Sequence, residues 1–147
     1  MTSIGDRVFS GCSGFTGDLI IPNKVTLIEV GAFVRCKGFT GDLIIPNAVT
    51  SIGADAFSSC TGLNGNIIIP TSVTSIDQWA FANCNGFLDF VVGWTMPLFV
   101  NKNIFMDVNI STKTLHVPKG TKAFYQNARV WQDFGTIVDD AHLFISP

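Results

Sequence analysis

The stretch Phe39-Thr40-Gly41-Asp42-Leu43-Ile44-Ile45-Pro46 decides the fold, because the same eight residues occur 24 positions earlier, at 15–22. The likeness extends on both sides of this stretch, and residues 15–38 and 39–62 are identical at sixteen of twenty-four positions. A third copy covers 63–86, and residues 1–14 match the second half of a copy. Self-similarity at a fixed period of this length is typical of solenoids and other stacked repeats.

Each 24-residue copy contains three short segments with different patterns. Leu-Ile-Ile-Pro reads as a strand of β-branched residues that a proline ends. Val-Thr-x-Ile reads as a second extended piece on the opposite side of a coil. Ala-Phe-x-x-Cys is interpreted as a single helical turn, since Ala32 and Cys36 are four residues apart. Stacking such coils at ~4.8 Å predicts a solenoid with one parallel sheet along one side.

The pattern decays after Gly86, so 1–147 is interpreted as one domain with a degenerate repeat at 87–118 and a cap and tail at 119–147. In the cap, Thr121 is predicted to be the N-cap of a helix over 122–130. Helical spacing places Phe124, Ala128 and Trp131 on one face of that helix. A last strand is expected over 136–138, and 141–147 reads as a tail.

Composition excludes several classes of protein. The chain of 147 residues is 47% apolar and 14% charged, against about a quarter charged on average, which excludes a disordered chain. Nine Lys and Arg and a net charge of −2 argue against a nucleic-acid partner. The longest apolar-rich stretch, 87–100, contains Asp89 and Pro97 and is too short to span a bilayer.

The beginning of the chain lacks a secretion signal and falls in the middle of a copy. Met1 occupies the place that Val25 holds in the next copy. We therefore expect a fragment of a longer array. Its first coil, with Ile4 and Phe9, is predicted to pack against another molecule, including end-to-end self-association, or to be partly disordered.

The repeat Phe-Thr-Gly-Asp-Leu-Ile-Ile-Pro-Asn-x-Val-Thr-x-Ile-x-x-x-Ala-Phe-x-x-Cys-x-Gly resembles the BspA-like branch of the leucine-rich-repeat proteins. Residues 115–122 and 130–134 are similar to the closing segment of such proteins from anaerobic gut and oral bacteria. The resemblance implies an α/β fold: a right-handed leucine-rich-repeat solenoid of short parallel strands with helical turns and a C-terminal helical cap. It also implies an extracellular or cell-surface protein without catalytic residues, and some relatives are implicated in adhesion to host matrix proteins or other bacteria.

The cysteines recur once per coil, at Cys12, Cys36, Cys60 and Cys84. Coils ~4.8 Å apart spread the four thiols over roughly 14 Å, whereas tetrahedral zinc needs sulfurs at about 2.3 Å. No metal and no cofactor are therefore predicted. Disulfides between neighbouring coils stay an alternative, because the Cα spacing falls near the allowed range. Buried free thiols, packed as small apolar groups, are the favoured interpretation.

Other polar residues are interpreted as structural. His116 and His142 stand alone in the sequence and are read as surface or capped-end histidines. No Gly-x-Ser-x-Gly motif and no phosphate-binding glycine loop occurs in the sequence, which argues against an enzyme. Two ladders of polar side chains are expected to bond between coils. They are Thr2, Thr26, Thr50 and Thr74, and Asn23 and Asn47.

The outward face of the Leu-Ile-Ile strands is the candidate binding site. Successive side chains of a strand alternate sides, so if Leu19 and Ile21 point inward, Asp18 and Ile20 point outward. The candidate residues are Asp18, Ile20, Asp42, Ile44, Asn66 and Ile68. Two interpretations stay open: the apolar stripe binds a partner, or the isoleucines only stabilise the strands through packing between coils.

The leading functional hypothesis is a non-enzymatic, protein-binding solenoid of the cell surface that adheres to host extracellular-matrix proteins or other cells. The alternative is a carbohydrate-binding or scaffold module of a larger secreted protein. Exposed aromatic rings would favour sugars. Trp94 and Tyr125 are the candidate rings, since Trp131 is assigned to the core of the cap and Trp79 to the helical-turn segment.

Overall fold

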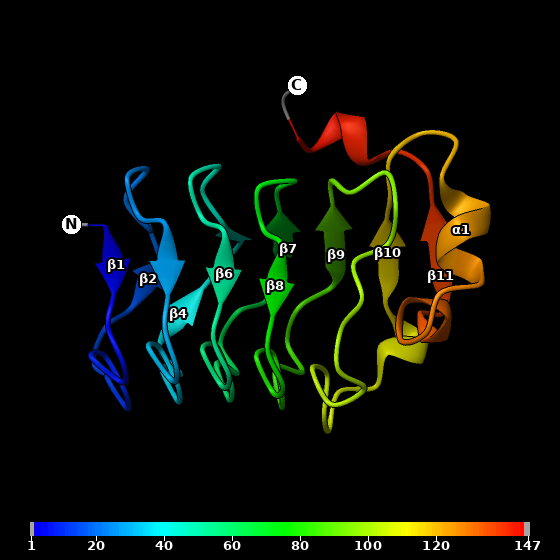
Figure 1. Cartoon of the computed structure of the whole chain (residues 1–147). Coiled ribbons are helices and arrows are strands. Elements are labelled where there is room, and N and C mark those ends of the chain that lie inside the picture. Colours follow the sequence, from blue (N-terminus) through cyan, green and yellow to red (C-terminus); the bar gives the residue numbers. More distant parts are fainter. Residues whose placement is uncertain (1, 146–147) are drawn as a thin grey trace.

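The chain forms a parallel β-solenoid of about six turns, or rungs, in a computed structural model that describes residues 2–145 (Figure 1). The expectation for Met1 lies outside the described residues, as do residues 146 and 147. Within residues 2–145, no helix is long and apolar enough to cross a bilayer.

Two main sheets run along the solenoid, where the sequence predicted one. The first sheet is built from the Val-Thr-x-Ile segments, and the second from the Leu-Ile-Ile segments and their degenerate successors. Both extended pieces of a copy therefore pair with neighbouring rungs. The physical reason is that an extended backbone must satisfy its N–H and C=O groups somewhere, and a stacked coil offers partners on both sides. The first sheet contains β1 (Ser3–Ile4), β3 (Leu27–Ile28), β6 (Ser51–Ile52) and β8 (Ser75–Ile76), in that order. The second contains β5 (Leu43–Ile44), β7 (Asn66–Ile69), β9 (Asp89–Val92), β10 (Thr114–His116) and β11 (Thr136–Val138).

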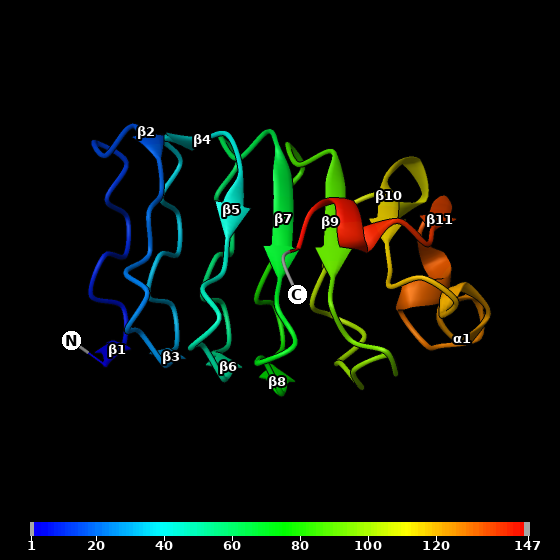
Figure 2. The same cartoon turned by 90° about the horizontal axis from the view of Figure 1, so that it is seen from above.

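Figures 1 and 2 place the two sheets on different sides of the coil. All pairs within each sheet are parallel. Register follows the repeat closely in the first rungs: Ser3 pairs with Leu27, and Leu43 with Ile67, each one period further on. The strand predicted over 136–138 is confirmed as β11.

The first Leu-Ile-Ile segment, 19–21, is not a strand, and that prediction is wrong for this copy. A separate pair, β2 (Gly17–Asp18) with β4 (Phe39–Thr40), joins the first two rungs instead. Gly17 pairs with Phe39, 22 residues on, and not with Gly41, its counterpart in the repeat. Because of this slip, the first rung does not extend the second sheet.

The Ala-Phe-x-x-Cys segments are not helical, which corrects a second prediction. Residues with left-handed backbone stand at two fixed places, one directly before each segment and one within it. The first is Arg7, Gly31, Asp55 and Trp79, and the second is Gly11, Arg35, Ser59, Asn83 and Asp107. Alternation of left- and right-handed residues turns alternate N–H groups toward the next rung, so Phe33 donates to Ala56 O at 2.8 Å and Phe57 to Ala80 O at 2.9 Å. A helix would have consumed these donors within its own turn.

Columns of identical side chains fill the interior. The rings of Phe9, Phe33, Phe57 and Phe81 stack at centroid distances of 5.4, 5.5 and 5.6 Å. The column continues to Phe105 at 6.2 Å. Buried aliphatic columns run beside it, for instance Val25, Val49 and Val73. Each rung thus completes the hydrophobic core of its neighbours, as the repeat predicts.

The far end of the solenoid contains little helix. The predicted helix over 122–130 is only α1 (Lys122–Gln126), followed by the 3-10 turn η2 (Trp131–Asp133). Thr121 stands at the N-cap position, but its hydroxyl donates to Pro118 O and caps no N–H group of the helix. Phe124 is 51% exposed, while Tyr125 and Trp131 are buried. Because α1 ends at Gln126, the helical spacing predicted for Phe124, Ala128 and Trp131 does not apply.

Candidate functional site

The side of the solenoid formed by the Leu-Ile-Ile segments shows the alternation that the sequence predicts. Leu19 and Ile21 are buried, whereas Ile20 between them is 79% exposed. In the next rung Leu43 and Ile45 are buried and Ile44 is 56% exposed. We call Ile20, Ile44 and the half-buried Ile68 the isoleucine stripe.

The isoleucine stripe ends where the C-terminal segment crosses the sheet. Val91 pairs with Ile68 and points the same way, yet it is fully buried. Residues 141–145 pass over this part of the molecule (Figure 2), and the Phe144 ring lies 4.7 Å from the ring of His116, which is Val91's neighbour on β10. The exposed apolar surface of this face is therefore concentrated on the first three rungs.

A row of polar groups runs beside the stripe. Asp18 and Asp42 are exposed, and Asn66 is partly buried. Asp42 Oδ1 accepts the Asn66 N–H at 2.7 Å, so this carboxylate also joins two rungs. A Cβ at Gly65 would lie 2.1 Å from the same oxygen, which explains why glycine precedes the polar residue of that rung. Neither Asp18 nor Asp42 forms an ion pair within the described chain.

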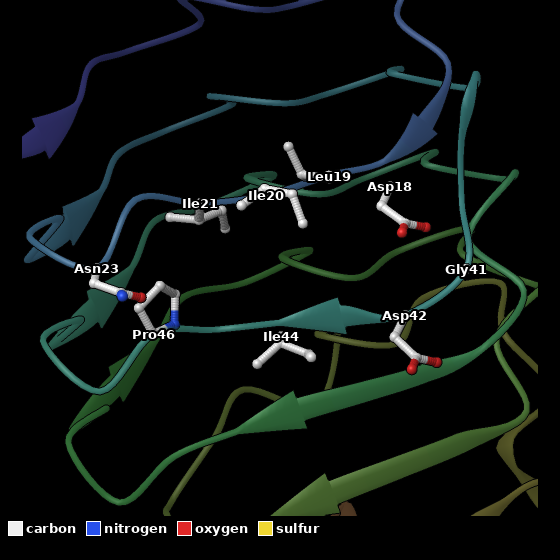
Figure 3. A pocket seen from close by; sticks show the side chains of 9 residues that line it. All are labelled: Asp18, Leu19, Ile20, Ile21, Asn23, Gly41, Asp42, Ile44 and Pro46. Atoms are coloured by element: carbon white, nitrogen blue, oxygen red, sulfur yellow. The ribbon is translucent and has the colours of Figure 1, made fainter.

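A groove opens between the first rung and β5. It accompanies the shift of register in the pairing of β2 with β4. Its volume is about 440 Å³, and four candidate residues line it: Asp18, Ile20, Asp42 and Ile44. Figure 3 shows the two carboxylates beside each other at one end and Asn23 and Pro46 at the other. The structure therefore brings the first two rungs of the predicted site together around one hollow, while Asn66 and Ile68 lie beyond it on β7.

Sequence reasoning missed a polar cluster around His116. This side chain is buried, and its Nδ1 lies 2.5 Å from Asp140 Oδ1 and its Nε2 2.8 Å from Asp89 Oδ1. His116 and Asp140 are 24 residues apart, so the repeat period itself is the signal that could have paired them. His116 is thus not alone, and it joins β9, β10 and the chain that leads into η3 (Ala141–Leu143). His142 is exposed, as expected for a surface histidine.

The cysteines are free, and three of them are buried. Their thiols donate hydrogen bonds to carbonyl oxygens of the preceding rung: Cys36 to Phe9, Cys60 to Phe33 and Cys84 to Phe57. Burial raises the pKa of all three thiols. Within residues 2–145, no group of three or more His, Cys, Asp or Glu could hold a metal ion.

The threonine ladder has the structural role expected of it. Thr26 Oγ1 donates to Thr2 O at 2.8 Å, and Thr50 and Thr74 repeat the bond along the first sheet at 3.2 Å. Both candidate sugar-binding rings are buried: Trp94 donates its indole N–H to Val73 O, and Tyr125 donates its hydroxyl to Trp94 O. These two rings offer no face to a sugar. Trp131 is in the core, as predicted.

Fold and surface together define a β-solenoid with a repeated outward face. Residues 2–129 match the BspA type leucine-rich repeat region, in six copies, and the chain belongs to that family. Its repeats are typically protein-binding and non-catalytic, and the family is usually of bacterial surface proteins.

A crystal structure of a leucine-rich repeat protein from Bacteroides ovatus is similar, with 23% sequence identity and a TM-score of 0.48. The match covers 92% of this chain and 40% of that chain, so this chain spans less than half of that protein's length. No protein of curated function matches the sequence.

Proposed function

We propose that this chain is an adhesive, protein-binding module of a bacterial cell surface, and that the isoleucine stripe with Asp18, Asp42 and Asn66 is its binding site. The observation that carries the proposal is the exposure of Ile20 and Ile44, 79% and 56%, on the outward side of neighbouring Leu-Ile-Ile segments. Large aliphatic side chains in a contiguous exposed row favour an interaction site. The partner is a protein of the host extracellular matrix or of another cell surface.

The alternative explanation of the stripe is cross-rung packing that stabilises the strands. If the isoleucines served only to pack between rungs, they would need contact with one another. The exposure of most of Ile20 to water would then bring no gain in stability. Binding to a sugar has less support, because Trp94 and Tyr125 are in the core.

Simultaneous replacement Ile20→Thr, Ile44→Thr and Ile68→Thr tests the site. Threonine keeps the β-branched shape that strands favour, so the fold should persist. We expect affinity for whichever protein of a matrix panel binds the unmodified chain to fall at least about tenfold, as for residues at the centre of an interface. The matched control replaces three exposed apolar residues outside the stripe, Val8, Leu27 and Val30, by threonine. Equal affinities of the two triple variants would refute the proposal.

Self-association through the first rung is a separate proposal about partners. An apolar hollow of about 270 Å³ lies there, lined by Phe9, Phe15 and Phe33 among others. Phe15→Asp should abolish concentration-dependent association in sedimentation measurements, since it places a charge in the hollow. A chain that is monomeric before the substitution would contradict this proposal and leave the adhesive one intact.

A further inference from the structure

The second sheet has an open edge at β5, although another rung lies beside it. Ile45 N–H donates to Ile68 O at 3.0 Å across β5 and β7. The equivalent bond one rung earlier, from Ile21 N–H to Ile44 O, is absent. Among the described residues, no backbone hydrogen bond joins 19–21 to 43–46. The two segments are neighbours that do not pair.

The unpaired groups at this edge belong to Ile44. Successive residues of a strand direct their N–H and C=O groups to opposite edges, and Ile45 uses the edge that faces β7. The N–H and C=O of Ile44 therefore face the first rung, and they have no partner there. An exposed strand edge of this kind is a template for pairing with another chain.

The groove beside this edge has the size and the lining of a ligand site. Its volume of about 440 Å³ lies within the range of about 300–1,000 Å³ usual for ligand sites. Leu19, Ile20, Ile21 and Ile44 contribute to the walls, with Asp18 and Asp42 at one end (Figure 3). Because neither carboxylate has a cation partner in the described chain, this end of the groove is complementary to a positive charge.

We propose that β5 accepts an extended, cationic peptide segment of the partner protein as an added strand. Backbone bonds to Ile44 hold the segment, apolar side chains of the segment cover Ile20 and Ile44, and a Lys or Arg lies beside Asp18 and Asp42. Strand addition of this type uses main-chain bonds for affinity and side chains for specificity. The inference rests on the proposed function and deepens it, since it specifies the chemistry of the partner and its mode of binding.

Hydrogen exchange of the full chain tests the open edge without any partner. The Ile44 amide should exchange much faster than the Ile45 amide, because only Ile45 is bonded within the sheet. Equal protection of the two amides would mean that the first rung closes the edge in solution. That result overturns the inference and says nothing against binding by the stripe.

Binding is tested with a synthetic probe, the fluorescent peptide Lys-Val-Thr-Val-Thr-Val with blocked ends. We expect it to slow exchange at Ile44, and to bind at least about tenfold more weakly when its alternate amides are N-methylated or its lysine is replaced by glutamate. Ile44→Pro removes the free N–H and leaves the Ile45 bond, since proline is tolerated at a strand edge. It should weaken peptide binding at least about tenfold more than the matched Ile44→Thr, which also removes the isoleucine side chain but keeps the N–H. Circular dichroism and urea unfolding check that both variants fold.

Two results separate this inference from the proposed function. The triple threonine variant keeps every backbone group of the groove. A saturating concentration of the peptide should therefore still slow exchange of the amide at position 44, even where the variant no longer binds the matrix protein. Equal peptide affinity for Ile44→Pro and Ile44→Thr, or association of two copies of the chain through β5 in place of peptide binding, overturns the inference. Loss of matrix binding by the triple variant in the same experiment would leave the proposed function standing.

Discussion

The Sγ of Cys60 lies 3.1 Å from the carbonyl oxygen of Phe33 in the preceding rung and donates a hydrogen bond to it. Cys36 and Cys84 repeat the contact at 3.0 and 2.9 Å. The cysteine column therefore fills space in the core and also bonds each rung to the one before it.

Cys60→Ala should lower the free energy of unfolding by about 1–2 kcal/mol, because it removes both a buried bond and buried volume. Cys12 is only partly buried, and Cys12→Ala should cost less than about 0.5 kcal/mol. Urea unfolding of the two variants measures the difference. Equal losses would show that the bond to Phe33 contributes nothing.

Stability should decrease in alkaline solution. Burial raises the pKa of the Cys84 thiol from 9.0 to about 12, so the unfolded chain releases this proton at a lower pH than the folded chain does. The contribution of the buried, protonated thiol to the free energy of unfolding is therefore fully present below pH 9. It is lost as the pH rises toward 12. Burial raises the pKa of Cys60 and of Tyr125 in the same direction. Denaturant titrations from pH 7 to 11 test this, and Cys84→Ala should make the decline shallower. A flat profile would contradict it.

Gly62→Ala should destabilise the stack, because its Cβ would lie 2.4 Å from the carbonyl oxygens of Lys37 and Phe39. Since backbone atoms cannot move aside cheaply, the expected loss is about 1–3 kcal/mol. Gly14 is the matched control, as nothing lies within 4 Å of a Cβ there. Gly14→Ala should change thermal stability only slightly, and a similar loss at both positions would mean that the rungs adjust without strain.

Tyr125→Phe should cost about 1–3 kcal/mol by leaving the buried Trp94 carbonyl without its donor at 2.6 Å. Phe124→Leu is the comparison on the same helix, since Phe124 is half exposed and the exchange keeps an apolar side chain. Urea midpoints measure both effects. If the Phe124 variant loses more stability, the assignment of Tyr125 as the anchor of this end is wrong.

Much of the fold could be predicted from the repeat. The 24-residue period places Phe33 over Phe9 and Cys60 over Cys36, and the rule of alternate sides in a strand places Ile20 and Ile44 outward. Local sequence patterns predicted the backbone conformation less reliably where contacts with the neighbouring rung decide it. Ala-Phe-x-x-Cys resembles a helical turn, but left-handed residues such as Asp55 and Ser59 direct its N–H groups to the next rung.

The candidate site was predicted in part. Asp18, Ile20, Asp42 and Ile44 line one groove, which no pattern in the sequence indicates, because it arises from a two-residue slip between nearly identical copies. The buried cluster of His116 with Asp89 and Asp140 was missed as well. Its members belong to degenerate rungs, where equivalent positions of the repeat no longer carry the same type of residue.

By itself, the sequence determined that the rungs stack, which side chains form the buried columns and which isoleucines face outward. These follow from period and alternation, and both are local properties of the chain. Only the tertiary structure decided that two sheets form, that β5 has an open edge and that residues 141–145 cover the far part of the sheet. Those features depend on how the backbone groups of one rung meet those of another, and identical copies can meet in more than one register.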